Sequence, residues 1–500
     1  NIKKNSLTGI ILQILLIVIG FISQRVLNMT MGQALIGLNG TISNVINIIS
    51  VSELGFSTAV IFHLYGAMAS GDERSICSLI RIYRRFYYII AAVILLIGLV
   101  MMPFMHLFLK ENPFSLSFVR IVYILWLLKT VLSYPLGYKR SILVADQKEY
   151  LSAIFTFFAS AFMYIAITIL IPLTKNYILV LLLSVIFEAA MGLILYAIID
   201  KRYPYLKKHS AEPVDAGLKS TLFSDVKNIF VSCLSARLLI CTDNLIISSF
   251  ISIITTGMYA NYCLITQSIT NIVLSLNRGI QPTIGNLFTE DDGEKKYQAF
   301  RQFLFLYFLI AAFVAASLLT LLSPFVGGLW LSVDFILPGD VVFLLAINCA
   351  FQILGFPLAC TIEVTGLFEK ERNLSIATVL INIGVSLALV KPLGVLGVLI
   401  GTLLTYIVQI VVRSRFIVSD YLHMAVSPVL SELFVYALLI LSEAVACQRL
   451  CRLIYPDFSI QGFIVSGLIC VILPNLLNLI LFGRTERYQK LVYLIKRSRD

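Results

Sequence analysis

Charged residues are scarce in this sequence, and their scarcity argues against a soluble protein. Only 13% of the 500 residues are Asp, Glu, Lys or Arg, compared with roughly a quarter in soluble domains. The charges avoid apolar runs of about 20 residues and collect between them, as transmembrane helices require. Since 59% of the residues are hydrophobic and the mean hydropathy is +0.93, we predict a polytopic membrane protein.

The sequence also lacks the motifs of a metal site or a disulfide framework. Its 9 cysteines include no CxxC motif, and its 4 histidines are scattered. Cys447 and Cys451 form the one close pair, four residues apart near a predicted helix end, where disulfide geometry favours two free thiols over a bridge. We therefore expect no metal and no cofactor, and we leave coupling to protons or sodium ions open.

No polar interval is long enough to fold a domain outside the membrane. The longest runs from Lys201 to Lys227, and the predicted outer connections are short and nearly uncharged. An oligosaccharide polymerase or a membrane glycosyltransferase would need an extracytoplasmic catalytic loop, for which this chain has no room. The acids around Asp72 and Asp292 lie among bases, so we interpret them as solvated charges rather than catalytic carboxylates. An enzyme is therefore not expected.

The apolar runs predict fourteen membrane spans. Lys3 and Lys4 precede the first run and no small-residue cleavage site follows it, so we expect this run to remain as a helix. The net charge of +11 is concentrated in the connections on the side of Lys3, which is a positive-inside pattern with both termini cytoplasmic. This topology in the cell membrane explains the charge better than nucleic-acid binding does. The predicted spans are 7–28, 37–66, 86–109, 117–138, 150–173, 177–200, 222–250, 256–282, 302–325, 339–362, 374–391, 394–413, 427–447 and 460–482.

A repeated pattern indicates two related halves. Tyr134-Pro135-Leu136 precedes Phe356-Pro357-Leu358 by 222 residues, and Lys148-Glu149 precedes Lys370-Glu371 by the same offset. Each half then contains six spans, and an even number gives both halves the same orientation in the membrane. Proline at a span end is predicted to end or kink the helix.

The predicted fold is all-α, with two parallel six-helix bundles around a central cavity and two further C-terminal helices. The predicted parts of the chain are an N-terminal six-helix lobe at 1–208, a C-terminal six-helix lobe at 209–420, and spans 13 and 14 with a basic cytoplasmic tail at 421–500.

Short motifs in both halves resemble a family of transporters. Ser52-Glu53-Leu54-Gly55 and Arg84-Arg85-Phe86-Tyr87 resemble the first repeat, and Thr242-Asp243-Asn244 with Pro282-x-x-Gly285-Asn286 the second repeat, of polysaccharide flippases of the Wzx and oligosaccharide-transporter type. These flippases belong to the MOP superfamily, together with multidrug MATE exporters and lipid II flippases. The resemblance implies alternating-access transport of polyprenyl-pyrophosphate-linked oligosaccharide repeat units to the outer leaflet, for surface polysaccharide biosynthesis. A cation-coupled, MATE-like multidrug exporter is the alternative.

The same resemblance implies the partners of the protein. They are the lipid-linked oligosaccharide substrate, membrane lipids, and polysaccharide polymerase and assembly proteins; nucleic acid is not among them. The tail from Arg484 to Arg499 alternates bases with apolar residues. We expect it to form a short amphipathic helix on the anionic inner leaflet.

Three bases within apolar spans are candidate substrate-binding residues: Arg25, Lys129 and Arg237. An unpaired charge at mid-depth costs roughly 2.5 to 3.5 kcal/mol on insertion scales, so each base needs compensation. We predict that these bases bind the pyrophosphate in a wet cavity. For Arg25, snorkelling to the interface is an equal alternative. For the other two bases the alternative is a structural ion pair.

Acidic residues in the same spans are candidate partners. Glu53 and Asp243 are predicted either to bind a coupling cation or to balance a neighbouring base, and Glu188 is a further acid available for pairing. Asp243 cannot pair with Arg237 within one helix, because six residues correspond to about 240° of rotation. Trp126 lies three residues before Lys129 and is predicted to share a face of span 4 with it.

The alternation of bases makes a topology prediction. A thiol reagent that cannot cross membranes should label single cysteines placed at Lys175 or Asn112 in intact cells, and should miss those placed at Lys208 or Lys295. Reversed labelling at any one of the four positions would contradict the fourteen-span topology.

Overall fold

The computed structural model of the chain describes residues 2–50, 56–208, 234–235, 237–288, 292–454 and 459–497, and every regular element in these ranges is helical. Eleven of the helices are long and apolar enough to cross a membrane. The other three predicted spans correspond to α2 with α3, to the helical stretch 237–250, and to α11. The prediction of an all-α membrane protein with about fourteen spans is confirmed.

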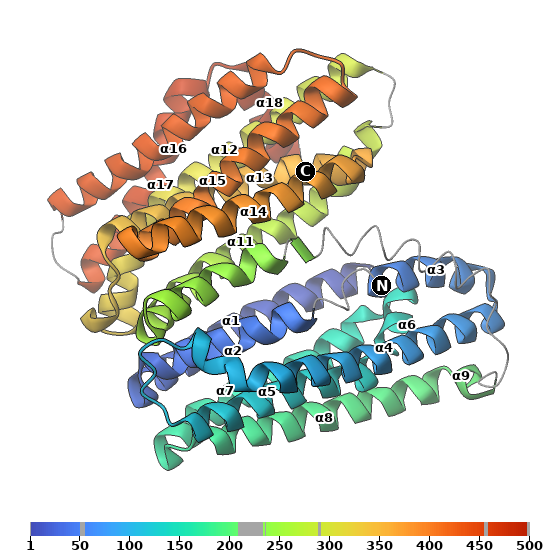
Figure 1. Ribbon diagram of the computed structural model, residues 1–500. Coiled ribbons are helices and arrows are strands. Elements are labelled where there is room, and N and C mark those ends of the chain that lie inside the picture. The colour runs from blue at the N-terminus through green and yellow to red at the C-terminus, as the bar shows by residue number, and fades with distance from the viewer. Residues whose placement is uncertain are drawn as a thin grey trace. The chain divides into compact units, whose positions relative to one another are not determined.

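Packing divides the chain into two compact units, Asn1–Gly257 and Met258–Asp500. In the first unit α1 packs against α7, and α5 and α7 both pack against α8 (Figure 1). The helices before the helical stretch 237–250 are α1 (Ile2–Met31), α2 (Gln33–Ile49), α3 (Phe56–Ser70), α4 (Glu73–Met101), η2 (Met102–Phe108), α5 (Leu116–Gly137), α6 (Arg140–Ala145), α7 (Glu149–Thr174), α8 (Tyr177–Arg202) and α9 (Tyr205–Lys208).

The second unit is built around α12, which packs against α13, α16 and α17. The two C-terminal helices α16 and α17 thus extend the second unit. The elements from Ile253 onward are α11 (Ile253–Phe288), α12 (Gly293–Pro324), η3 (Phe325–Trp330), η4 (Val333–Phe335), α13 (Gly339–Thr365), α14 (Phe368–Leu393), α15 (Val395–Arg415), η5 (Phe416–Tyr421), α16 (Ser427–Ile454), α17 (Ile460–Phe482) and α18 (Glu486–Arg497).

Two helices begin well before the apolar runs that revealed them. The runs predicted starts near 86 and 302, whereas α4 begins at Glu73 and α12 at Gly293. Aspartates fix both starts: Asp72 accepts hydrogen bonds from the main-chain N–H of Arg74 and Ser75, and Asp292 from that of Lys295. Hydropathy marks only the membrane-buried part of a helix, so bases expected in connections lie on helical turns beyond it.

The offset of 222 residues does not hold throughout the chain. Pro135 and Pro357 keep this offset, but Pro135 lies in the last turn of α5, as predicted, whereas Pro357 lies eight residues before the end of α13. Beyond the prolines, the left-handed residues Gln147 (φ 53°) and Gly366 (φ 73°) are 219 residues apart. The first half therefore has three more residues here, because its chain leaves α5 at Gly137 and forms the short helix α6.

Because of this shift, the repeated Lys-Glu pair occupies different positions relative to the helices of the two halves. Lys148 precedes α7 and pairs with Asp146, whereas Lys370 lies inside α14 and pairs with Asp420 at 2.5 Å. The two lysines are not equivalent in space, although the sequence places them at the same offset. They do have the same role, because each lysine lies at the N-terminal end of a helix, α7 for Lys148 and α14 for Lys370, and pairs with an acid.

Within the first unit, α2 and the first turn of α11 cross with their backbones in contact. A Cβ atom on Gly37 would lie 1.9 Å from the main-chain oxygen of Ile253, and one on Gly257 would lie 2.0 Å from that of Gln33. Only glycine fits at such a crossing. The adjoining loop reinforces the contact, because Lys110 donates main-chain and side-chain hydrogen bonds to Ser248 and Phe250, at 3.0 and 2.7 Å.

We expect Gly37→Ala to destabilise the protein by about 1 to 3 kcal/mol, because the methyl group forces two helix backbones apart. Gly40→Ala is the matched control, since a Cβ atom there has nothing within 4 Å and alanine favours the helix. The measurement is the melting temperature of purified protein in detergent. Equal melting temperatures for the two variants would refute the close crossing.

Candidate functional site

An ion pair lies in the middle of the first unit, between α5 and α8. Lys129 is 13 residues from Leu116, the first residue of α5, and therefore roughly 20 Å along a helix. Its ammonium nitrogen is 3.1 Å from the carboxylate of Glu188 on α8 and 3.5 Å from the sulfur of Met163 on α7. Lys129 is 18% exposed and Glu188 35%, so the pair is only partly covered by the helices of the first unit.

Trp126 continues this site one helical turn from Lys129. The ammonium nitrogen lies 5.1 Å from the centroid of the indole ring, within the range of a cation–π interaction. The indole N–H of Trp126 donates to the amide oxygen of Asn39 on α2 at 3.3 Å. The predicted shared face of Trp126 and Lys129 is confirmed, and the indole ring is held in place by a third helix.

Arg140 brings a second cation under the influence of the same carboxylate. It begins α6, just beyond the end of α5, and its Nε atom is buried without a hydrogen-bond partner among the described residues. Burial lowers the pKa of Arg140, and the negative charge of Glu188 opposes this shift. Lys129 is in contact with Glu188, and Arg140 is near enough to be affected by the charge of the same carboxylate. The sequence analysis did not select Arg140 as a candidate, because it lies outside the predicted span 117–138.

Ion pairs lie near the C-terminal ends of α5 and α8. Lys139, which is 5% exposed, pairs with Asp200 and lies 3.4 Å from the centroid of the Tyr196 ring. Burial raises the pKa of Asp146, but hydrogen bonds from Lys148 and Tyr203 outweigh this effect and hold it below its ordinary value. Each of these acids is thus paired with a base, in contrast to the buried Nε atom of Arg140.

The structure brings together one predicted base and one available acid, and separates the other candidates from them. Arg25 is exposed on α1, six residues from its end at Met31. Arg237 is half-buried and Asp243 is 8% exposed, both in the helical stretch 237–250. The contacts of Lys129 are with Glu188, Met163 and Trp126 rather than with these residues. Glu53 lies outside the described residues.

A second acid within the spans escaped the sequence analysis. Glu443 on α16 is 2% exposed and accepts a hydrogen bond from the amide of Asn478 on α17 at 3.1 Å. Its Oε1 atom and the Oδ1 atom of Asn478 have no hydrogen-bond partner among the described residues. A single proton on Glu443 would supply a donor for these acceptors. The signal was available, because Glu443 lies inside the predicted span 427–447 and an acid within a span is a site candidate by default.

The corresponding positions of the second unit carry no charge. The residue 222 positions after Lys129 is Phe351, on α13. Counted from the first residue of each helix, Glu188 on α8 corresponds to Tyr406 on α15. Polar but neutral side chains lie nearby; for example, Asn348 donates to the main-chain oxygen of Leu399 at 3.0 Å. The ion pair therefore distinguishes the first half of the chain from the second.

No protein-family model matches the sequence, and no curated protein sequence matches it. Solved structures do match the fold. The lipid II flippase MurJ in an inward closed conformation aligns with a TM-score of 0.69 and 12% identity, over 95% of this chain and 98% of that one. An inward-facing multidrug resistance MATE transporter of the MOP superfamily aligns with a TM-score of 0.65 and 14% identity, over 82% and 97%.

A MOP superfamily transporter from Pyrococcus furiosus aligns with a TM-score of 0.57 and 15% identity, over 85% of this chain and 96% of that one. These identities are low, so the alignments speak for architecture rather than for substrate. The chain is a multi-pass membrane protein with the fold of MOP superfamily transporters.

Proposed function

We propose that the protein is a flippase that moves polyprenyl-pyrophosphate-linked oligosaccharide repeat units from the cytoplasmic to the outer leaflet by alternating access, for surface polysaccharide biosynthesis. The observation that carries this proposal is the contact of Lys129 with Glu188 inside the first unit, together with the buried Nε atom of Arg140, a second base that the charge of the same carboxylate affects. An excess of positive charge in a low-dielectric interior favours an anionic ligand.

The pyrophosphate of the substrate suits this cluster. Its oxygens replace Glu188 as the partner of Lys129 and accept hydrogen bonds from the guanidinium of Arg140, whose planar donor fork matches phosphate geometry. Trp126 then offers an aromatic face beside the phosphate for the first sugar. Arg25 and Arg237 bind further along the same path. Asp243 and Glu53 either balance the charge of these bases or bind a coupling proton or sodium ion. Glu188 has the same two roles once the substrate has displaced it from Lys129.

The two C-terminal helices support a flippase over the alternative, a cation-coupled exporter. The aligned MurJ structure covers 95% of this chain, whereas the aligned MATE structure covers 82%. A carboxylate that is already paired with Lys129 is also a poor partner for a cationic drug. On this proposal, the polymerase and the assembly proteins of the polysaccharide act on the product at the outer leaflet.

We expect Lys129→Met to reduce transport at least tenfold, because the loss of one charge-assisted hydrogen bond costs about 1.5 to 3 kcal/mol. The measurement is surface glycan, and inner-leaflet undecaprenyl-linked sugar units, per unit of monodisperse protein extracted. Lys391→Met, which removes an exposed base near the end of α14, is the control.

A double variant separates binding from charge balance. If Lys129 serves only to neutralise Glu188, Lys129→Met with Glu188→Gln should restore transport. If Lys129 binds pyrophosphate, the double variant should fold as well as the wild type and still fail to transport. Restored transport would refute the binding role of Lys129.

Arg237 gives an independent prediction. If it binds pyrophosphate, Arg237→Ala should abolish glycan export and Arg237→Lys should retain part of it, because an ammonium group lacks the donor fork of a guanidinium. A structural ion pair predicts instead a lower amount of folded protein and normal transport per folded molecule. That second result would remove Arg237 from the site.

The exporter alternative is tested by deleting the protein from its host. A flippase predicts accumulation of undecaprenyl-linked sugar units in the inner leaflet. Normal surface glycan together with increased sensitivity to cationic dyes would favour the exporter and contradict the proposed function.

A further inference from the structure

The second unit contains a cavity of about 700 Å³ that none of the transport residues lines. It lies between the first turns of α12 and α16, and the end of α17 and the helix α18 close it. On α12, Lys295, Gln298, Gln302 and Phe305 face it at spacings of three and four residues, so they share one face of the helix.

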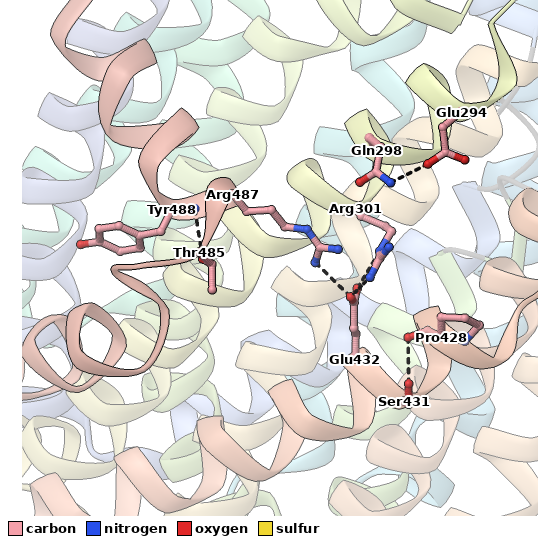
Figure 2. A network of polar contacts seen from close by, with 9 residues as sticks. All are labelled: Glu294, Gln298, Arg301, Pro428, Ser431, Glu432, Thr485, Arg487 and Tyr488. Carbon is pink, nitrogen blue, oxygen red and sulfur yellow. Dashed lines mark hydrogen bonds and ion pairs between the residues drawn. The ribbon is translucent and has the colours of Figure 1, made fainter.

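One carboxylate and two guanidinium groups link the three helices α12, α16 and α18 around this cavity. Glu432 on α16 accepts hydrogen bonds from Nε of Arg301 on α12, at 3.1 Å, and from Nη2 of the same residue. It also forms an ion pair with Nη1 of Arg487 on α18 at 3.0 Å. Figure 2 shows the two arginines converging on Glu432 from opposite sides. Since both arginines keep their charge, this trio carries a net positive charge.

The remaining polar contacts hold α18 over the cavity. Gln302 donates to the main-chain oxygen of Arg487 at 2.9 Å, which joins α12 to α18. Lys490, one turn further along α18, pairs with Glu486 at 2.6 Å and is 62% exposed. On α18, Arg487 is therefore held by Glu432, whereas Lys490, one turn further along, is mostly exposed.

The base of the cavity is apolar. Phe305 packs edge-on against Phe482 at 5.3 Å between ring centroids, and Tyr436 lies beside both. Phe305 is ten residues after Lys295 on α12, and therefore roughly 15 Å further along the helix. The cavity thus has cationic groups at its mouth, and its aromatic rings begin about one helical turn beyond the contact of Gln302 with Arg487.

We propose that this cavity binds one anionic phospholipid, with its phosphate at Arg487 and Lys490 and an acyl chain against Phe305, Tyr436 and Phe482. The mouth lies at the helix ends that the distribution of bases predicts to be cytoplasmic, where the inner leaflet supplies anionic headgroups. A free phosphate ion would not use the aromatic base, and a zwitterionic lipid would not use the surplus charge. The bound lipid joins α18 to α12 and α16, and so stabilises the second unit.

The test uses the purified full-length protein in detergent, titrated with phosphatidylglycerol or with phosphatidylcholine of the same acyl chains. Bound lipid is counted by native mass spectrometry, and the melting temperature is recorded. We expect phosphatidylglycerol to bind with the higher affinity and to raise the melting temperature in proportion to its occupancy. Glycerol 3-phosphate alone should produce neither effect.

Two variants assign the effect to this cavity. Lys490→Gln leaves the Glu432 network intact and should weaken phosphatidylglycerol binding roughly tenfold, as should Arg487→Gln. Arg484→Gln is the matched control, because Arg484 is an exposed base of the same segment that does not line the cavity. The proposal is overturned if the two lipids bind equally, if glycerol 3-phosphate reproduces the shift, or if Arg484→Gln weakens binding as much as Lys490→Gln.

Discussion

An ammonium group near the middle of a membrane-spanning helix must be compensated, and this requirement shapes the first unit. Hydrocarbon rejects the charge of Lys129 unless a neighbouring helix brings an acid within contact distance. Glu188 does so from α8, while Met163 on α7 and Trp126 surround the ammonium group. The helices α5 and α8 must therefore pack so that Lys129 and Glu188 lie at the same level. The same contact also places charged groups inside the first unit.

The two halves of the chain use charge differently. In the first unit an ion pair lies at mid-depth, whereas the second unit has Phe351 and Tyr406 at the corresponding positions. The ion pairs of its described residues lie near helix ends, as in Arg413 with Glu371 at 2.5 Å. Among the described residues, a mid-depth ion pair thus lies in the first unit, whereas the corresponding positions of the second unit carry neutral side chains. On the proposed function, this asymmetry suits a substrate with a charged head and a neutral sugar chain.

The C-terminal helices are an integral part of the second unit. Cys447 of α16 and Cys470 of α17 pack with Ala316 of α12 in a fully buried cluster, so these helices cover a face of α12. Glu443 and Asn478 lie in the same interface, and each has one oxygen with no hydrogen-bond partner among the described residues. At the other end of α16, Glu432 connects α12 with α18. A buried acid therefore lies in the part of the chain that the repeat does not include, and a lipid-sized cavity lies where this part packs against α12.

The sequence by itself determined the class of the protein, the all-α fold and the number of spans, because hydropathy reports the transfer free energy of each segment independently of its neighbours. It also identified Lys129 and Trp126, since spacing along one helix fixes which side chains share a face. Tertiary structure decided the rest. The choice of Glu188 as the partner, the approach of Arg140, the three-residue shift after Pro135 and the cavity under α18 all depend on contacts between distant helices. Local composition carries no information about which distant side chain will lie opposite another.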